Sequence, residues 1–273
     1  AGISLETGES VIFRAKTVIL ACGGAGVVYQ NTSNPSDLTG DGFALALDAG
    51  AELMDMEFVQ FYPLGFVFPN SLKGALGGLL YHVHLRNKST ERFMSKYDSQ
   101  RLELSTRDRV TRAIMNEIKE GRGGPRGGVF ADMTYHEPGF IARLQPALHQ
   151  TYKKIGIDPE KEYLEVAPTC HFFMGGVKVD SHWQSKVPGL FVVGESAAGL
   201  HGANRLSQNA LSEILVSGVS AGRQAAKLAL KNGWIPIDVA DANCTAELVN
   251  RTIRGNGGVT PADLRAKLRQ TMW

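Results

Sequence analysis

The stretch TVILACGGAG occupies residues 17–26, and the stretch LFVVGE occupies residues 190–195. Each begins with a short run of apolar, β-branched residues, which is typical of a buried strand in an α/β sheet. The first run feeds a turn at Gly23 and Gly24, and the second ends in a glycine followed by Glu195. Because α/β proteins bind ligands at the carboxyl ends of their strands, Glu195 is a candidate ligand for sugar or ribityl hydroxyls. The alternative is a solvent-facing acid after the strand.

Working outward, the spacing of apolar residues predicts the other elements. Helices are expected at 43–54 after TGDG (39–42), at 105–121, at 138–156, from Asp158-Pro159, and at 209–230. Ser105 with Asp108 resembles a capping box. Residues 57–70 carry five aromatics and two prolines and favour strands and turns. Near both ends of the sequence a strand is followed by a helix, whereas the central part does not show this order. This arrangement predicts an α/β domain interrupted by an insertion.

The composition excludes several classes of function. The chain has 273 residues with 29 Lys+Arg and 27 Asp+Glu, and this near balance argues against binding nucleic acid. No apolar run approaches the roughly 18 residues of a membrane helix, and no signal peptide opens the sequence. Three scattered cysteines form no CxxC and fit a reducing compartment.

Three short motifs suggest other functions, but each supports its function only weakly. There is no P-loop, and Tyr29 stands where a complete GxGxxG would need glycine. GVSAG (218–222) matches the hydrolase elbow GxSxG, but it lies in a helical run, so small residues on a helix explain it better than a catalytic Ser220. His82 and His84, expected on one face of a strand, lack the further ligands of a zinc site, and no metal is predicted.

Nine stretches taken together resemble the flavoprotein subunits of succinate dehydrogenase and fumarate reductase, with L-aspartate oxidase as a near relative. They are ACGGAG (21–26), TGDG (39–42), EFVQFYP (57–63), ERFM (91–94), TRDRV (106–110), EIKEGRG (117–123), HFFMGG (171–176), PGLFVVGE (188–195) and HGANRLSQNALSE (201–213). They cover roughly residues 15–230 in the family's order, and HGANRL followed by N-x-L is very specific.

The resemblance implies a site residue by residue. The positions that match FAD-binding residues are Gly23, Gly24, Asp41, Glu195, Ala210 and Leu211. The positions that match substrate-binding residues are Tyr62, His171 and Arg205, and Arg107 matches the residue that transfers the proton. The implied reaction adds or removes hydrogen across a C–C bond, with hydride exchange at flavin N5. Arginine suits carboxylate binding because its planar fork can bind both oxygens.

The resemblance also implies an architecture. The fold would be a partial FAD-binding α/β domain of the glutathione-reductase-like Rossmann type with an inserted α+β capping domain. The expected boundaries are 1–57 and 166–233 for the FAD-binding domain, 58–165 for the capping domain and 234–273 for the start of a C-terminal helical domain. Closure of the cap would exclude water and bring Arg107 to the substrate.

The sequence departs from the family in three respects. Tyr62 replaces the usual His, and PNSLKGALGG (69–78) replaces Thr-Glu-x-x-Arg-Gly, leaving Asn70, Ser71 and Lys73 as its polar side chains. A different acid, or a thiol- or quinone-coupled variant, would fit as well. The family's N-terminal dinucleotide glycines lie outside the sequence, so we expect this piece alone to bind FAD weakly or not at all.

The expected function is therefore a FAD-dependent oxidoreductase acting on a dicarboxylate, whose partner is an iron-sulfur or other electron-transfer subunit. A cytoplasmic location is expected, peripheral at the inner membrane through partner subunits, with no nucleic acid and no membrane span. An L-aspartate-oxidase-like enzyme and a catalytically inactive, partner-binding fragment are the alternatives.

Overall fold

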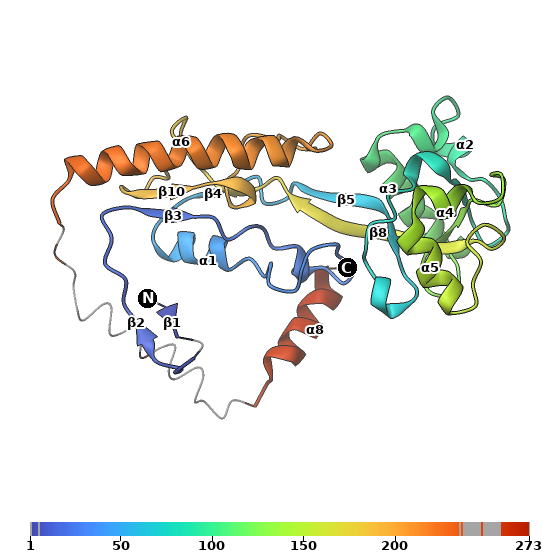
Figure 1. The fold of residues 1–273 in the computed structure, drawn as a ribbon, viewed down its shortest axis with the longest axis horizontal. Helices are drawn as coiled ribbons and strands as arrows, with labels where there is room; N and C mark the ends of the chain where they lie inside the picture. The colour runs from blue at the N-terminus through green and yellow to red at the C-terminus, as the bar shows by residue number, and fades with distance from the viewer. Residues whose placement is uncertain (1, 5, 235, 237–246, 248–257, 273) are drawn as a thin grey trace. The chain divides into compact units, whose positions relative to one another are not determined.

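The computed structural model describes residues 2–4, 6–234, 236, 247 and 258–272 (Figure 1). The chain divides into a first unit, within residues 1–24, 40–57 and 174–272, and a second unit, within residues 25–39 and 58–173. The second unit thus interrupts the first in the sequence. It contains the predicted insertion 58–165 and also takes in residues 25–39 and 166–173. The role of this unit as a capping domain stays a prediction.

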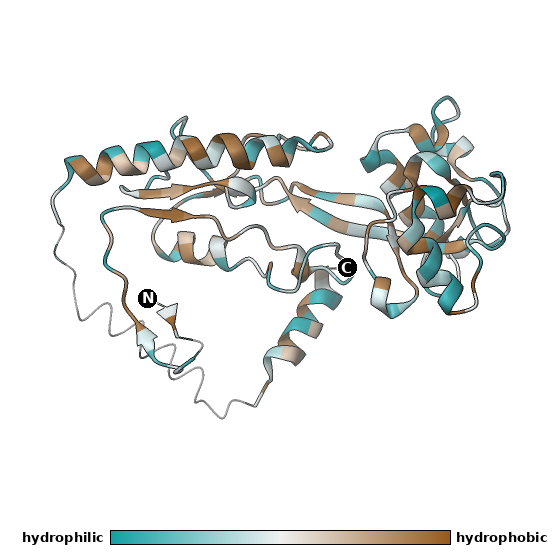
Figure 2. Cartoon of the chain, in the orientation of Figure 1, coloured by the Kyte–Doolittle hydropathy of each residue, from teal (hydrophilic) through white to brown (hydrophobic). Residues whose placement is uncertain are grey.

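The first unit is built on two short parallel strands. Strand β3 (Val18–Leu20) pairs with β10 (Leu190–Val192), so the two stretches that suggested the fold lie side by side. Helix α6 (Asn209–Lys231) packs on both strands, and Phe191, Val193, Ala221 and Ala225 form the core between them. Figure 2 shows the apolar character of β3 and β10 and its alternation along α6. Strands covered by helices confirm the α/β class.

Smaller elements complete the first unit. Helix α1 (Asp41–Asp48) follows TGDG, β4 (Leu53–Met54) pairs with β9 (Gly176–Val177), and β1 (Gly2–Ile3) pairs with β2 (Ser10–Val11). The 3-10 turn η6 (Gly194–Ser196) follows β10, and α8 (Pro261–Met272) lies near the end of the chain. The predicted C-terminal helical domain falls largely on residues 237–246 and 248–257, which lie outside the described residues.

The second unit is a four-stranded antiparallel sheet covered by helices. The strand order is β5 (Val59–Phe66), β8 (Leu164–Phe173), β7 (Val129–Asp132) and β6 (His84–Arg86). Helix α3 (Arg107–Glu117) packs on β5, and the short α2 (Met94–Tyr97) packs on α3. The remaining helical turns are η1 (Gly26–Val28), η2 (Asn70–Leu72), η3 (Leu80–His82), η4 (Leu102–Leu104), η5 (Ile118–Arg122), α4 (Phe140–Leu144) and α5 (Pro146–Lys154).

Three of the predicted helices have different bounds. The run 43–54 leaves the helix after Asp48, because Gly50 turns the chain at a φ of +90° and Leu53–Met54 joins a strand. The run 138–156 splits into α4 and α5, since the ring of Pro146 fixes its own φ and removes an amide donor at the break. Residues after Asp158 form a turn instead of a helix.

The predicted capping box is also wrong. Thr106 is the N-cap of α3, and the Ser105 hydroxyl donates instead to Asp98 at 2.7 Å. Asp108 pairs with Arg112 on the same helix at 2.6 Å. The helix thus starts without a side-chain cap, and its first residue is Arg107.

A buried carboxylate ties the end of α3 to its surroundings. Glu117 has no exposed side-chain surface and accepts hydrogen bonds from Arg122 at 2.6 and 2.7 Å, from Asn87 at 3.0 Å and from Tyr97 at 2.9 Å. The hydrogen bonds from Arg122 hold the pKa of Glu117 at about 2, against the opposing effect of burial. The motif EIKEGRG therefore has a structural role in this fold.

We expect Arg122→Ala to lower the Tm by several degrees, because it leaves a buried charge without its main partner. A carboxyl group whose folded pKa is depressed stabilises the fold above its unfolded pKa, near 4.3, and loses that contribution as the pH falls through about 2. Thermal melts between pH 2 and 7 should therefore show a weaker acid dependence in the variant. Lys119→Ala, an exposed change on the same turn, is the control; equal melting curves for wild type and Arg122→Ala would contradict the assignment.

Among the described residues, no helix has the length and apolar character needed to cross a bilayer.

Candidate functional site

The carboxyl ends of β3 and β10 bring three of the predicted cofactor residues together. Gly23 and Gly24 follow β3, and Glu195 follows β10. A Cβ atom on Gly24 would lie 2.3 Å from Oε1 of Glu195, so the backbone and the carboxylate are in direct contact. Gly23 has a φ of +75°, which favours glycine, and its carbonyl accepts a hydrogen bond from Ser196 Oγ at 2.9 Å. This edge of the sheet presents a half-buried acid beside bare backbone.

Asp41 enters the same unit through α1. It is the first residue of the helix and is exposed. The next residue, Gly42, lies so close to Cys22 that a Cβ there would come within 2.9 Å of the cysteine Cβ. Because Cys22 directly precedes Gly23, this contact fixes the start of α1 against the glycine turn.

The loop before α6 carries the predicted Arg205. Arg205 is 6% exposed, and its Nη1 donates to the carbonyl of Leu206 at 3.2 Å. At the start of α6, Ala210 is half-buried, while the amide of Leu211 already donates to the carbonyl of Gln208 at 3.1 Å. Any donation from Leu211 to a cofactor carbonyl would therefore share this hydrogen. The roles of Arg205, Ala210 and Leu211 stay predictions.

The other predicted residues cluster in the second unit. Arg107, the first residue of α3, holds its guanidinium carbon 5.2 Å from the centre of the Tyr62 ring on β5. The ring of His171, on β8, lies 6.2 Å from the same tyrosine ring. The packing of α3 on β5 includes a bond from Thr111 Oγ1 to the carbonyl of Phe61 at 3.4 Å. Three side chains far apart in sequence thus come together at one place.

The charge state of Tyr62 follows from its surroundings. Burial raises its pKa above the ordinary value of 10, and the positive charge of Arg107 only partly opposes this. Tyr62 is therefore a neutral hydroxyl at physiological pH. It can donate or accept a hydrogen bond, but it does not supply the positive charge of a protonated histidine.

Sequence reasoning missed the residues that hold His171 in place. Ser33 Oγ lies 3.0 Å from His171 Nδ1 and also donates to the carbonyl of Cys170 at 3.2 Å. Asn34 Nδ2 donates to the carbonyl of His171 at 3.1 Å. The only signal was the polar run NTSN at residues 31–34, which is typical of a turn and indicates no partner.

The stretch that replaces Thr-Glu-x-x-Arg-Gly, residues 69–78, lies beside the sheet of the second unit. Asn70, Ser71 and Lys73 are all exposed. The backbone around Gly74 is held in place, with Thr169 Oγ1 donating to its carbonyl at 2.9 Å. The stretch thus has a fixed backbone and directs its polar side chains toward solvent.

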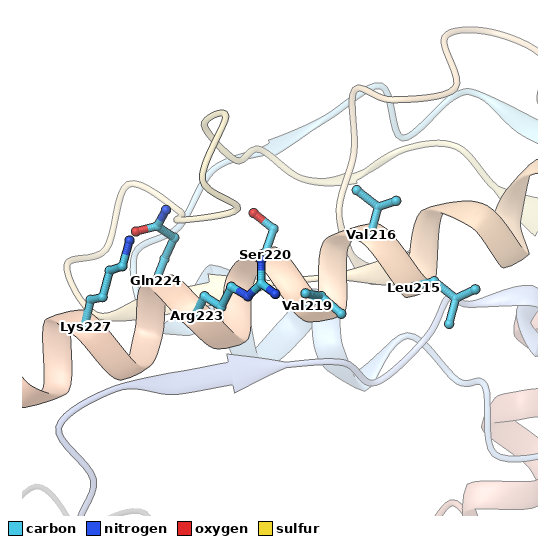
Figure 3. Close-up of a pocket in the computed structure, with 7 residues that line it drawn as sticks. All are labelled: Leu215, Val216, Val219, Ser220, Arg223, Gln224 and Lys227. Carbon is cyan, nitrogen blue, oxygen red and sulfur yellow. The ribbon is translucent and has the colours of Figure 1, made fainter.

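The competing motifs have structural explanations. Ser220 lies in the middle of α6, which confirms the helical interpretation of GVSAG. Figure 3 shows it in a shallow pocket whose labelled lining residues all belong to that one helix, so no strand–turn elbow is present there. The prediction that His82 and His84 share a strand is wrong, because His82 ends η3 and His84 starts β6. His84 stacks on Tyr135 with ring centres 3.9 Å apart.

One group in the described residues has the composition of a metal site. It consists of His149, Asp158 and Glu160. The Glu160 carboxylate accepts hydrogen bonds from the amides of Gly139, Ile141 and Ala142 at 2.8–3.1 Å, and Lys153 donates to Asp158 at 3.0 Å. These contacts explain the two acids as a cap for α4 and an ion pair.

The residues of the first unit fit a flavin dinucleotide in one direct respect. Gly24 keeps open a space beside Glu195 that any side chain would fill. The carboxylate at the strand ends can accept hydrogen bonds from hydroxyl groups, and the bare backbone permits close approach. Glu195, Gly23 and Gly24 would hold the cofactor there.

Comparisons with known proteins agree with this fit. The sequence matches the FAD binding domain family over residues 1–211. It is 42% identical over 280 residues to a fumarate reductase (CoM/CoB) subunit from Methanothermobacter marburgensis, covering 100% of this chain and 50% of the relative. It is 34% identical to the fumarate reductase flavoprotein subunit of Escherichia coli, covering 99% of this chain and 48% of the relative. The chain spans about half the length of these curated relatives.

The fold gives the same result. The solved structure of Mycobacterium smegmatis Sdh1 in complex with UQ1 superposes with a TM-score of 0.80 at 37% identity, covering 94% of this chain and 44% of that one. The predicted α/β FAD-binding fold, the FAD cofactor and the resemblance to fumarate reductase and succinate dehydrogenase flavoproteins are thereby confirmed. The chain belongs to the FAD binding domain family.

Proposed function

We propose that the protein containing this chain is a FAD-dependent oxidoreductase of the fumarate/succinate type, which interconverts a dicarboxylate and its unsaturated form. The observation that carries the proposal is the cluster of Arg107, Tyr62 and His171 in the second unit. A guanidinium, a neutral hydroxyl and an imidazole side by side are suited to a carboxylate substrate and to a proton transfer.

Each residue has a distinct role in this reaction. His171 would bind substrate carboxylate oxygens, and the resemblance to the family gives Arg205 the same role. Tyr62 would donate one hydrogen bond, and Arg107 would give or take the proton at the second carbon. FAD, when bound, supplies the hydride exchange at N5. The positive charge of Arg107 would also stabilise negative charge that develops in the transition state.

The second carboxylate is bound differently in this protein, because the stretch 69–78 offers neither Glu nor Arg and its polar side chains are exposed. The similarity to the relative from Methanothermobacter marburgensis, which is named a fumarate reductase, supports fumarate as the substrate in spite of this difference.

That relative is also named as one subunit of its enzyme, which supports the presence of an electron-transfer partner. We propose an iron-sulfur protein as this partner. We place the protein in the cytoplasm, peripheral at the inner membrane through such partners.

A substrate panel on the full-length protein tests the function. With reduced viologen as electron donor, we expect fumarate to be reduced, and with an artificial acceptor we expect succinate to be oxidised. L-Aspartate is the matched alternative, since it shares both carboxylates and differs by an amino group. Oxidation of L-aspartate without turnover of fumarate or succinate would contradict the proposal, as would a FAD-loaded protein inactive on all three.

A further inference from the structure

The loop that carries Arg205 is bent at several points. Gly199 and Gly202 have φ values of +99° and +57°, and Gln208, directly before α6, has a φ of +65°. A left-handed conformation at a non-glycine residue costs free energy and persists only when the surroundings enforce it. Within this loop Arg205 is 6% exposed, although its neighbour Leu206 is 76% exposed. Some other contact must therefore hold the loop in this shape.

The side chain of His201 makes one such contact. Its Nε2 lies 2.7 Å from Oε2 of Glu213, and the two side chains are only 4% and 1% exposed. Its Nδ1 lies 3.5 Å from the side-chain Nδ2 of Asn209. Asn209 and Glu213 are four residues apart and so lie on the same face of α6. One imidazole ring thus joins the loop to the first two turns of the helix.

The bridge formed by His201 restricts the position of the loop and that of the start of α6. The short bond to Glu213 is of the charge-assisted kind, and a buried carboxylate without a partner would be strongly disfavoured. His201 and Asn209 enclose the segment that contains Arg205, while Asn209 and Glu213 flank Ala210. The same ring consequently constrains both the segment that contains Arg205 and the start of α6.

We propose that His201 is a positioning residue that, by bridging Glu213 and Asn209, fixes Arg205 for the substrate carboxylate and the start of α6 for the cofactor. This inference rests on the proposed function only for the role of Arg205. It makes the bridge a determinant of substrate affinity and of the flavin environment, beyond its contribution to stability.

The test compares His201→Ala with Ser212→Ala in the full-length, FAD-loaded protein. Ser212 is exposed on the same turn of α6 and serves as the matched control. For His201→Ala we expect KM for fumarate to rise at least about tenfold with a smaller fall in kcat, because small displacements of a binding group are costly. The visible absorption band of the flavin should shift, and amide hydrogen exchange across residues 202–211 should accelerate. Ser212→Ala should leave all three unchanged.

Two further variants keep the proposal falsifiable. His201→Gln keeps a donor and an acceptor but loses the rigid ring that sets their spacing, so it should give smaller changes of the same kind, even where the alanine variant does not fold. Glu213→Gln still accepts a bond from His201 and should keep KM within about threefold of wild type. Wild-type KM, spectrum and exchange in His201→Gln or His201→Ala would overturn the proposal. If wild type does not turn over fumarate, the proposed function fails, whereas the spectrum and the exchange rates still decide the role of His201.

Discussion

Replacing Arg107 with alanine in the full-length protein is expected to lower turnover by about 10²–10⁴-fold while FAD stays bound. Arg107 lies in the second unit over the Tyr62 ring, whereas Gly24 and Glu195 lie in the first unit. The fold should tolerate the change, because a cation in the first turn of a helix meets the positive end of the helix dipole and gains little there. Steady-state assays with reduced viologen, together with the flavin-to-protein absorbance ratio, measure both parts.

The matched control for this prediction is Arg112→Ala on the same helix. The Arg112 side chain is 72% exposed, and its pair with Asp108 is a surface ion pair, which contributes little to stability. It should retain wild-type turnover. Arg107→Lys keeps the charge and loses the planar fork, so it should recover only part of the activity. Turnover near wild type in Arg107→Ala would refute the proposed role.

The second large effect is expected at Gly24. In Gly24→Ala the new Cβ would lie 2.3 Å from Oε1 and 2.6 Å from Cδ of Glu195, so the carboxylate has to leave its position. In the full-length protein, this variant should therefore lose most of its bound FAD while it stays folded. The flavin-to-protein ratio after purification measures the loss, and a far-UV circular dichroism spectrum checks the fold.

Gly222→Ala provides the control for Gly24→Ala. Gly222 lies within α6, and no atom lies within 4 Å of the place where its Cβ would be. Because alanine has the higher helix propensity, this variant should be slightly more stable and should keep its flavin. Full FAD occupancy in Gly24→Ala would contradict the prediction, because FAD would then bind without Glu195 in its observed position.

The parts of the fold that the sequence predicted are those fixed by local pattern. The apolar runs of β3 and β10 and the helical spacing of α6 were recognisable in the sequence, whereas the parallel pairing of the two strands was seen in the structure. The prediction of a helix over residues 43–54 was too long, because Gly50 and the pairing of Leu53–Met54 with a distant strand override the helical spacing. The Ser105 cap failed because Asp98, seven residues away, offers its hydroxyl a better partner.

The candidate site divides in the same way. The resemblance supplied Arg107, Tyr62 and His171, but their proximity depends on the register of β5 and β8, which contains irregularities at Gln60/Phe61 and Tyr62/Gly65. Apolar periodicity carries no information about such shifts. The contact between Ser33 and His171 joins residues 138 apart in sequence, so it became visible only in the structure.

The most direct test of the central claim is a single-turnover experiment on the full-length, FAD-loaded protein. The flavin is reduced without oxygen and mixed with fumarate in a stopped-flow instrument, and its visible absorbance is followed. For the proposed reaction we expect rapid return of the oxidised flavin band in wild type, with one succinate formed per flavin, and no return within the same time in Arg107→Ala of equal flavin content. A wild-type flavin that stays reduced in the presence of fumarate, or an Arg107→Ala variant that reoxidises equally fast, would contradict it.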